Sequence, residues 1–236
     1  FESKSAGGGL MKAWCLFEQS GTFRDAFKKH GIQAQCVDIR NDYNQTDIIL
    51  DLFSEINKAS LNLPSFFDNI AKDDIVFAFF PCVKFVEKHE LNSRGGASQF
   101  KNYTDLQKLA YSKKSVNELA LFYDLWCKMF EIALNRGFKM IVENPHNVCG
   151  VNFLQRYFPI KPKITIYDRN AYGGDKFKKP TSFWFVNCEP QNNFIFETPN
   201  LDKKTQAIAN TDKGKARSEI SPSFADRFLR EFVLTK

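Results

Sequence analysis

The chain lacks the features that mark secreted, membrane and zinc-binding proteins. No window of its 236 residues holds eighteen consecutive apolar residues, and the N-terminus has none of the basic, apolar and small-residue regions of a secretory signal. His146, Cys149 and Cys188 come nearest to metal-ligand spacing, but no second tight Cys or His pair completes four ligands. We therefore expect a soluble, cytoplasmic protein with no membrane partner and no bound metal.

The cysteine pattern also argues against a disulfide framework. Four of the six cysteines lie within apolar or periodic segments, without the close spacings of a secreted disulfide-rich domain. Reduced thiols fit this pattern better. Cys15, Cys36, Cys127 and Cys188 are expected to pack in the core, because free cysteine is among the most buried residue types.

Length and charge are what the chain does have. A chain of 236 residues can bury one sizeable core, which favours one domain with an appendage. The first ten residues end in a glycine run, and we expect them to be a remnant of cloning that precedes a natural start at Met11. Residues 156–179 hold seven basic and two acidic residues, which favours a polyanionic partner, although solvated loops give the same count.

Hydrophobic periodicity predicts strands that alternate with helices up to Pro145. Thr22 is expected to cap the first helix, Gly31 and Gly137 to end two of the helices, and the strands read as continuous apolar runs. Such a pattern is typical of an α/β fold of doubly wound, Rossmann-like type, a mostly parallel sheet with helices on both faces. The expected strands are 12–18, 32–40, 74–80 and 138–145, and the expected helices are 21–31, 47–59 and 115–137.

The pattern of hydrophobic residues changes after Pro145. Short β-like runs over 163–168, 181–187 and 192–197 predict a small antiparallel extension or a sheet edge, and a helix capped by Ser221 follows. We therefore divide the chain into a cofactor-binding and catalytic core, a small substrate-contact extension and a C-terminal helix that completes the core. These units span 11–151, 152–200 and 201–236.

Ligands of an open parallel sheet bind at the carboxyl ends of the strands, where the chain order switches direction. The residues that follow the expected strands include a loop at 18–22, Asp38, the Pro81-Cys82 pair and Glu143 with Asn144. One loop, one thiol and two carboxylates should therefore converge on one crevice. Taken alone, Cys82 at the end of an apolar run is more often a buried thiol than a nucleophile.

Four segments in this order and at these separations resemble the cytosine carbon-5 DNA methyltransferases, most of all the small forms of phage and gut bacterial genomes. The segments are "LFEQSGTF" at 16–23, "CVDIRND" at 36–42, "FPCVKF" at 80–85 and "VENP" at 142–145. Two later blocks, "KKPTSFWFVN" and "ARSEISPSFADRFL", are similar to the same small forms. The resemblance implies a class I methyltransferase fold, S-adenosylmethionine as cofactor, duplex DNA with a flipped cytosine as partner, and the cytoplasm of a bacterial host.

The resemblance also assigns roles in catalysis. By motif position Cys82 is the nucleophile that adds to cytosine carbon 6, and Pro81 fixes the turn that aims it. Glu143 would hold a proton on ring nitrogen 3, and Asn144 would orient the loop. A carboxyl pKa raised by its surroundings would help Glu143 in this role. Without the resemblance, a plain turn or cap explains Glu143 and Asn144 equally well.

The cofactor would lie against the first loop. The resemblance implies that this loop wraps the methionine end, that Asp38 accepts hydrogen bonds from the ribose hydroxyls and that Asp51 lies near the adenine. Asp38 could instead cap the following segment. The loop comprises Phe17, Glu18, Gln19, Ser20, Gly21, Thr22 and Phe23.

Basic residues are expected to contact the nucleic acid. No Gln-x-Arg-x-Arg block is present, and Arg156 and Arg169 are its nearest substitutes. Lys84 beside Cys82 could favour its deprotonation. Lys176, Lys178 and Lys179 form a basic loop suited to phosphate contacts or simply to solvation.

Two alternatives remain open. Gln19 and Thr22 stand where the family has glycines, and the chain is too short for a typical target recognition domain. A catalytically inactive, methyltransferase-like protein that binds nucleic acid or inhibits a defence system fits these departures. An RNA or nucleotide pyrimidine methyltransferase is the third reading, and a protein partner could supply sequence specificity.

Overall fold

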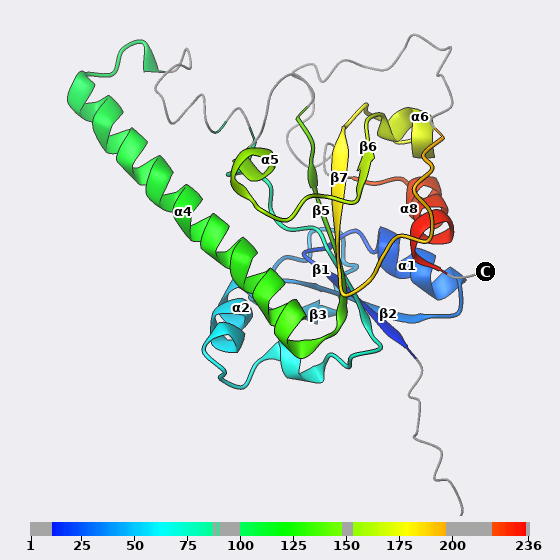
Figure 1. Ribbon diagram of the computed structural model, residues 1–236. Helices are drawn as coiled ribbons and strands as arrows, with labels where there is room; N and C mark the ends of the chain where they lie inside the picture. The colour runs from blue at the N-terminus through cyan, green and yellow to red at the C-terminus, as the bar shows by residue number, and fades with distance from the viewer. Residues whose placement is uncertain (1–10, 87–88, 90–99, 148–152, 197–218, 235–236) are drawn as a thin grey trace, which may run out of the picture.

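The protein is built around one mixed sheet that carries helices on both faces (Figure 1). The computed structural model describes residues 11–86, 89, 100–147, 153–196 and 219–234. The strand order across the sheet is β3-β2-β1-β4-β5-β7-β6, and every pairing is parallel except those of β7. The predicted α/β class is therefore confirmed. The strands are β1 (Lys12–Leu16), β2 (Gln33–Asp38), β3 (Ile48–Ile49), β4 (Ile75–Ala78), β5 (Lys139–Pro145), β6 (Ile164–Ile166) and β7 (Thr181–Val186).

Both faces of the central strands are covered by apolar side chains. In β1, Ala13 and Cys15 face the helices α1 (Thr22–Lys29) and α8 (Pro222–Phe228). Trp14 and Leu16 face the other layer, formed by α2 (Leu52–Ser60), the short 3-10 helix η1 (Phe66–Asn69) and α4 (Asp105–Arg136). Burial on two faces explains why these strands read as unbroken apolar runs rather than alternating ones.

The start of α1 corrects one prediction. Gly21, not Thr22, is the N-cap residue, and it adopts a left-handed φ of 73°. Thr22 is the first helical residue and its hydroxyl lies 3.0 Å from the Ser20 hydroxyl. The helix N-terminus is capped from outside by Glu18, whose carboxylate accepts from Phe23 N at 2.8 Å.

Two other elements differ from their predicted bounds. Residues 47–59 were expected to be one helix, but β3 occupies Ile48–Ile49 and α2 begins at Leu52, because the Asp51 carboxylate caps the helix there. The helix expected over 115–137 begins ten residues earlier, at Asp105. Its start is set by a capping box in which Thr104 accepts from Gln107 N at 3.3 Å. Gly137 ends it, as predicted.

The C-terminal part belongs to the same sheet. β7 pairs antiparallel with β5 on one side and with β6 on the other, so the sheet-edge alternative describes these strands. Residues 192–196 of the third predicted run form no strand. The last helix begins at Pro222 under a Ser221 cap, as predicted, and turns into a π-helix, η3 (Leu229–Val233). None of the helices in the described ranges is long and apolar enough to cross a bilayer.

Candidate functional site

The candidate site lies at the carboxyl edge, which we define as the edge where β1, β4 and β5 end (Figure 1). The chain leaves β1 toward β2 on one side and reaches β4 on the other, so the switch point falls between β1 and β4. Because β7 runs antiparallel, its first residue, Thr181, pairs with the last residue of β5, Pro145. The segment before β7 is thereby added to the same edge.

A pocket of about 190 Å³ opens at the carboxyl edge. Tyr43, Phe79, Phe80, Glu219 and Ile220 form part of its wall. The rest comes from predicted site residues, which the fold brings together from five separate segments. These residues are Phe17, Glu18, Gln19, Ser20, Pro81, Cys82, Glu143, Arg169 and Lys179.

Cys82 is half-buried two positions after Phe80, in the loop that follows β4. Burial raises the pKa of its thiol, the nearby Lys179 charge lowers it and the Glu143 charge raises it again. Lys84, which was expected to help ionise this thiol, is instead ion-paired with Glu118 of α4. The cation that acts on Cys82 is therefore Lys179.

Glu143 and Asn144 lie in the last three residues of β5, and Glu143 lines the same pocket as Cys82. The Asn144 amide donates to Phe80 O at 3.1 Å, which ties the end of β5 to the end of β4. The loop-orienting role of Asn144 remains a prediction, and this bond is compatible with it. Glu143 is 6% exposed, and its Oε1 has no hydrogen-bond partner among the described residues. A buried carboxylate oxygen without a partner is costly unless a ligand completes it.

Arg169 is buried and paired within the protein, so the prediction that it contacts nucleic acid at the surface is wrong. Its side chain is 1% exposed, pairs with Asp175, and lies 5.0 Å over the Phe224 ring. Its Nη1 is 4.0 Å from Glu143 Oε1. Asp175 in turn accepts from Ser221 N at 2.8 Å, so the pair fastens α6 (Arg169–Gly173) to the start of α8. The sequence gives no signal for this pairing, because the turn after α6 creates it.

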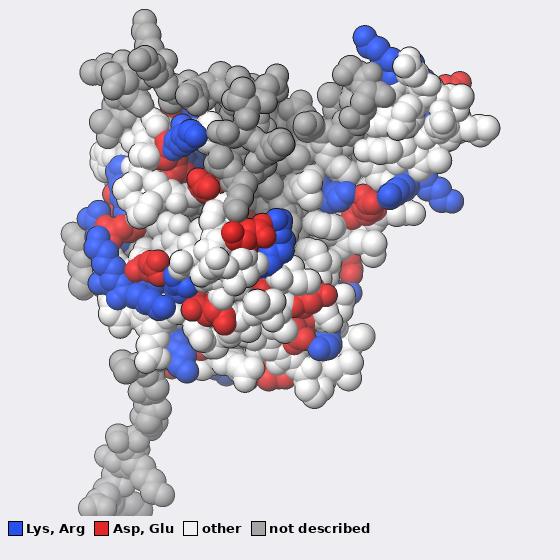
Figure 2. Space-filling model, turned by 180° about the vertical axis from the view of Figure 1, so that it is seen from behind, with Lys and Arg blue, Asp and Glu red and all other residues white. Residues whose placement is uncertain are grey.

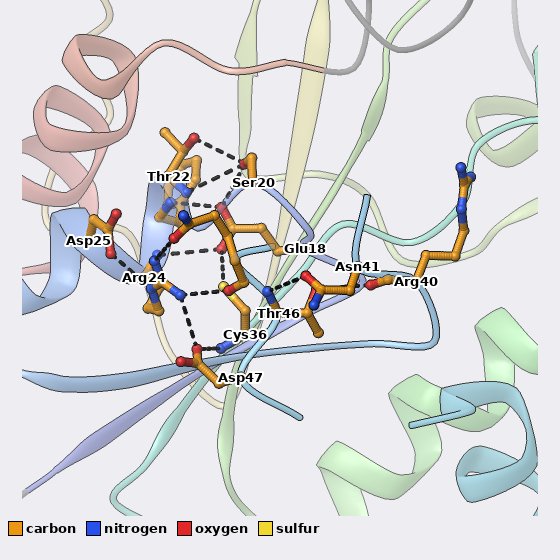
Figure 3. A network of polar contacts seen from close by, with 12 residues as sticks. Glu18, Ser20, Thr22, Arg24, Asp25, Cys36, Arg40, Asn41, Thr46 and Asp47 are labelled. Carbon is orange, nitrogen blue, oxygen red and sulfur yellow. Dashed lines mark hydrogen bonds and ion pairs between the residues drawn. The ribbon is translucent and has the colours of Figure 1, made fainter. Parts of the chain in front are cut away.

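The first loop is organised by a buried carboxylate (Figure 3). Glu18 Oε1 accepts from Phe23 N at 2.8 Å, while Oε2 lies 3.4 Å from Arg24 N and 3.3 Å from the Cys36 sulfur. Burial raises the pKa of Glu18, and these hydrogen bonds lower it in part. The amino end of α1 is therefore already occupied by a group from the chain itself.

Arg24 holds the outer side of the loop (Figure 3). Its guanidinium donates to Asp25 at 2.8 Å, to Gln45 O at 2.6 Å and to Asp47 at 3.3 Å. A Cβ on Gly21 would lie 2.5 Å from this guanidinium, which is the flexible end of a side chain, so the positive φ is the stronger reason for glycine at that position. The sequence analysis did not predict this network. The one feature of the sequence that could have indicated it is Gly21, the only glycine of the first loop.

The other residues assigned to the cofactor lie outside the pocket lining. Phe23 is fully buried and stacks 4.2 Å from Phe77, so its side chain belongs to the core. Asp51 caps α2 by accepting from Phe53 N at 3.1 Å. Asp38 accepts from Arg40 N at 2.7 Å, and burial raises its pKa. Asp38 still lies at the end of β2, next to the first loop.

The remaining basic residues are spread over the surface. Arg156 is exposed on α5 (Phe153–Tyr157), Lys176 lies over the Phe177 ring at 5.4 Å, and Lys178 is 3.7 Å from Asp168. Figure 2 shows that positive and negative side chains are interspersed on the face it presents. Among the predicted nucleic-acid contacts other than Arg169, only Lys179 lines the pocket.

The other thiols and the metal spacing can be placed in part. Cys15 and Cys36 are fully buried, and Cys127 and Cys188 are half-buried. The described residues contain no group of three His, Cys, Asp or Glu arranged to hold a metal ion, and Cys149 lies outside the described ranges. His146 instead shares a hydrogen bond with the Ser182 hydroxyl at 2.9 Å.

Compared with known proteins, the chain matches no family model and none of the curated proteins. The class is therefore defined by fold and site alone. It is an α/β protein with a mostly parallel seven-stranded sheet, and a pocket at the carboxyl edge of that sheet holds a thiol, a buried carboxylate and a lysine.

Proposed function

We propose that the protein transfers a methyl group from S-adenosylmethionine to carbon 5 of cytosine in DNA. The observation that supports this most is that Cys82 and Glu143, the nucleophile and the acid of the resemblance, line one pocket at the carboxyl edge. A nucleophile and a carboxyl group within one pocket are the parts that covalent addition to a pyrimidine ring requires. The resemblance supplies the choice of cytosine and of DNA.

The residues would divide the work in the following way. The Cys82 thiolate adds to carbon 6 of the ring, and the ring electrons move toward nitrogen 3. Glu143 Oε1 accepts no hydrogen bond from the described residues and lies 4.0 Å from Arg169 Nη1, so it is available to hold the proton at that nitrogen. The Asn144 amide fixes the end of β5 through Phe80 O, which keeps Glu143 beside Cys82.

The first loop fits a cofactor without a phosphate at this position. Dinucleotide-binding sheets place a pyrophosphate on the free N–H groups at the N-terminus of the first helix. Here the Glu18 carboxylate already accepts from two of those N–H groups, and its negative charge would repel a second anion. A sulfonium cofactor brings a positive charge and an electrophilic methyl group, and the unpartnered buried oxygen of Gln19 is free to accept a hydrogen bond from the ammonium group of its methionine part. Gln19 and Ser20 with Asp38 are the residues that would hold it.

The experiment is transfer of tritiated methyl from S-adenosylmethionine to cytosine-containing duplex DNA. Cys82→Ala is expected to abolish transfer, because Cys82 is the only thiol among the described residues that line the pocket. Cys188→Ala, at the opposite edge of the sheet, is the matched control and should retain activity. Fluorocytosine DNA should give a band shift on a denaturing gel that depends on Cys82 and on the methyl donor.

If the wild-type protein transfers no methyl group to DNA, the proposal is contradicted, and two further measurements show which alternative replaces it. Transfer to tRNA or to single strands, in competition with duplex DNA, would replace DNA by RNA as the substrate. Absence of any calorimetric signal with S-adenosylmethionine would favour a catalytically inactive nucleic-acid-binding protein.

A further inference from the structure

Four cations lie near the thiol in the sequence or at the carboxyl edge, and three of them are committed elsewhere. Lys84 pairs with Glu118. Lys178 is 3.7 Å from Asp168 and 59% exposed. Arg169 is bound to Asp175, and its Nη2 also lies 3.3 Å from Glu219 O. Within the described part of the chain, the fourth cation, Lys179, has no ion pair.

Backbone contacts fix the position of Lys179 at the edge of the pocket. The Thr181 hydroxyl donates to Lys179 O at 3.0 Å, and His146 N donates to Pro180 O at 2.9 Å. These bonds hold the segment before β7 against the residues that follow β5. Lys179 is consequently part of the pocket wall together with Cys82.

The charges around Cys82 make this lysine important. The thiol shares its pocket with three carboxylates, so a thiolate there is opposed by negative charge. Arg169 offsets only part of that charge, because it pairs with Asp175 and lies 4.0 Å from the carboxylate of Glu143 alone among the three. The titratable and charged groups that face the pocket are Glu18, Tyr43, Glu143, Arg169, Lys179 and Glu219.

We propose that Lys179 is the counter-ion that stabilises the thiolate of Cys82. When the thiol ionises, its proton passes to solvent and the ammonium group of Lys179 stays charged beside the sulfur. Lys179 is thus a positioning residue for the nucleophile of the proposed reaction, and this inference rests on the proposed function for its purpose. It gives Lys179 a role other than the predicted phosphate contact, and it gives Lys179 the activating role predicted for Lys84.

The test measures the rate at which iodoacetamide alkylates Cys82 as a function of pH, by mass spectrometry of the peptide that contains Cys82. Lys179→Met is expected to lower this rate at pH 7.5 by about threefold or more, because a cation that shares the pocket with the thiolate is lost. The rates of wild type and variant should converge at high pH, where every thiol is ionised. This convergence separates a charge effect from a change in access.

Two variants serve as controls. Lys179→Arg keeps the charge and should restore the wild-type profile, and Lys178→Met removes the neighbouring charge and should leave the profile unchanged. Identical profiles for wild type and Lys179→Met would overturn the inference, as would a loss of rate that persists at high pH. If Lys179→Met does not fold, as judged by circular dichroism, Lys179→Gln takes its place.

The assay contains neither methyl donor nor DNA. If methyl transfer fails but Lys179→Met lowers the alkylation rate of Cys82 as expected, only the proposed function is rejected. Normal methyl transfer together with an unchanged alkylation rate in Lys179→Met would reject only the proposal that Lys179 is the counter-ion of Cys82.

Discussion

The two edges of the sheet differ in what they hold. At the amino edge, where β1 and β5 begin, lie two cavities of about 590 Å³ each, whereas the pocket at the carboxyl edge has about 190 Å³. Among the described residues that line these two cavities, no buried side-chain nitrogen or oxygen lacks a hydrogen-bond partner; His30, for example, lies 3.1 Å from Asp226. Volume alone would therefore point to the wrong edge.

The carboxyl edge is distinguished by buried polar atoms that lack partners. Of the six such side-chain atoms in the described ranges, four belong to residues at this edge: Gln19, Glu143, Asn144 and Arg169. Each unmade hydrogen bond of a buried group costs about 1–3 kcal/mol. A fold keeps such groups where a ligand completes them, so the unsatisfied atoms locate the site better than the size of a cavity does.

The largest effect that should separate the edges is on activity. Glu143→Gln keeps the shape of the side chain but removes the carboxyl group, and methyl transfer is expected to fall by about a hundredfold or more. Glu189→Gln makes the same change at the amino edge and should leave transfer unchanged. Equal activity of Glu143→Gln and wild type, measured with the tritium assay, would remove Glu143 from the mechanism.

The next effect is on stability and compares two ion pairs. Asp175→Ala leaves Arg169 charged and buried, and urea unfolding should show a loss of about 3–5 kcal/mol. Glu189→Ala breaks the exposed pair with Lys163 and should cost about 1 kcal/mol or less. The double change Arg169→Met with Asp175→Leu should recover most of the loss. No recovery would mean that the two residues do not act as a pair.

The smallest effect concerns the pH dependence of stability through Glu18. Its pKa is raised above the ordinary 4.5 by burial, so the folded state binds a proton more tightly than the unfolded state. This contribution to the free energy of unfolding is present in full below pH 4.5 and is lost as the pH rises through the raised pKa. Glu18→Gln removes the titration, so its stability relative to wild type should increase from pH 4.5 to pH 8. Parallel curves for the two proteins would contradict the role of burial.

Much of the fold could be predicted from periodicity, because strands covered on two faces must be apolar and helices must show a stripe. The helix starts that were predicted wrongly are those at which a side chain caps the helix. Asp51 starts α2 and Thr104 starts α4, and short polar residues of this kind also occur in turns. The first-loop cap was assigned to Thr22 because its spacing fits a capping box, whereas a carboxylate from the preceding strand end performs the capping.

The sequence by itself determined the class of the fold and the residues at or just after the carboxyl end of each strand, among them Cys82 and Glu143. The rule that ligands meet the carboxyl ends of parallel strands then placed these residues at one edge. Only the tertiary structure decided which charges act there. Lys84 is near the thiol in the sequence and Lys179 is far from it, but Glu118 pairs with Lys84, and the antiparallel β7 brings Lys179 into the pocket. Electrostatic effects depend on distance in space and on pairing, and neither can be read from spacing along the chain.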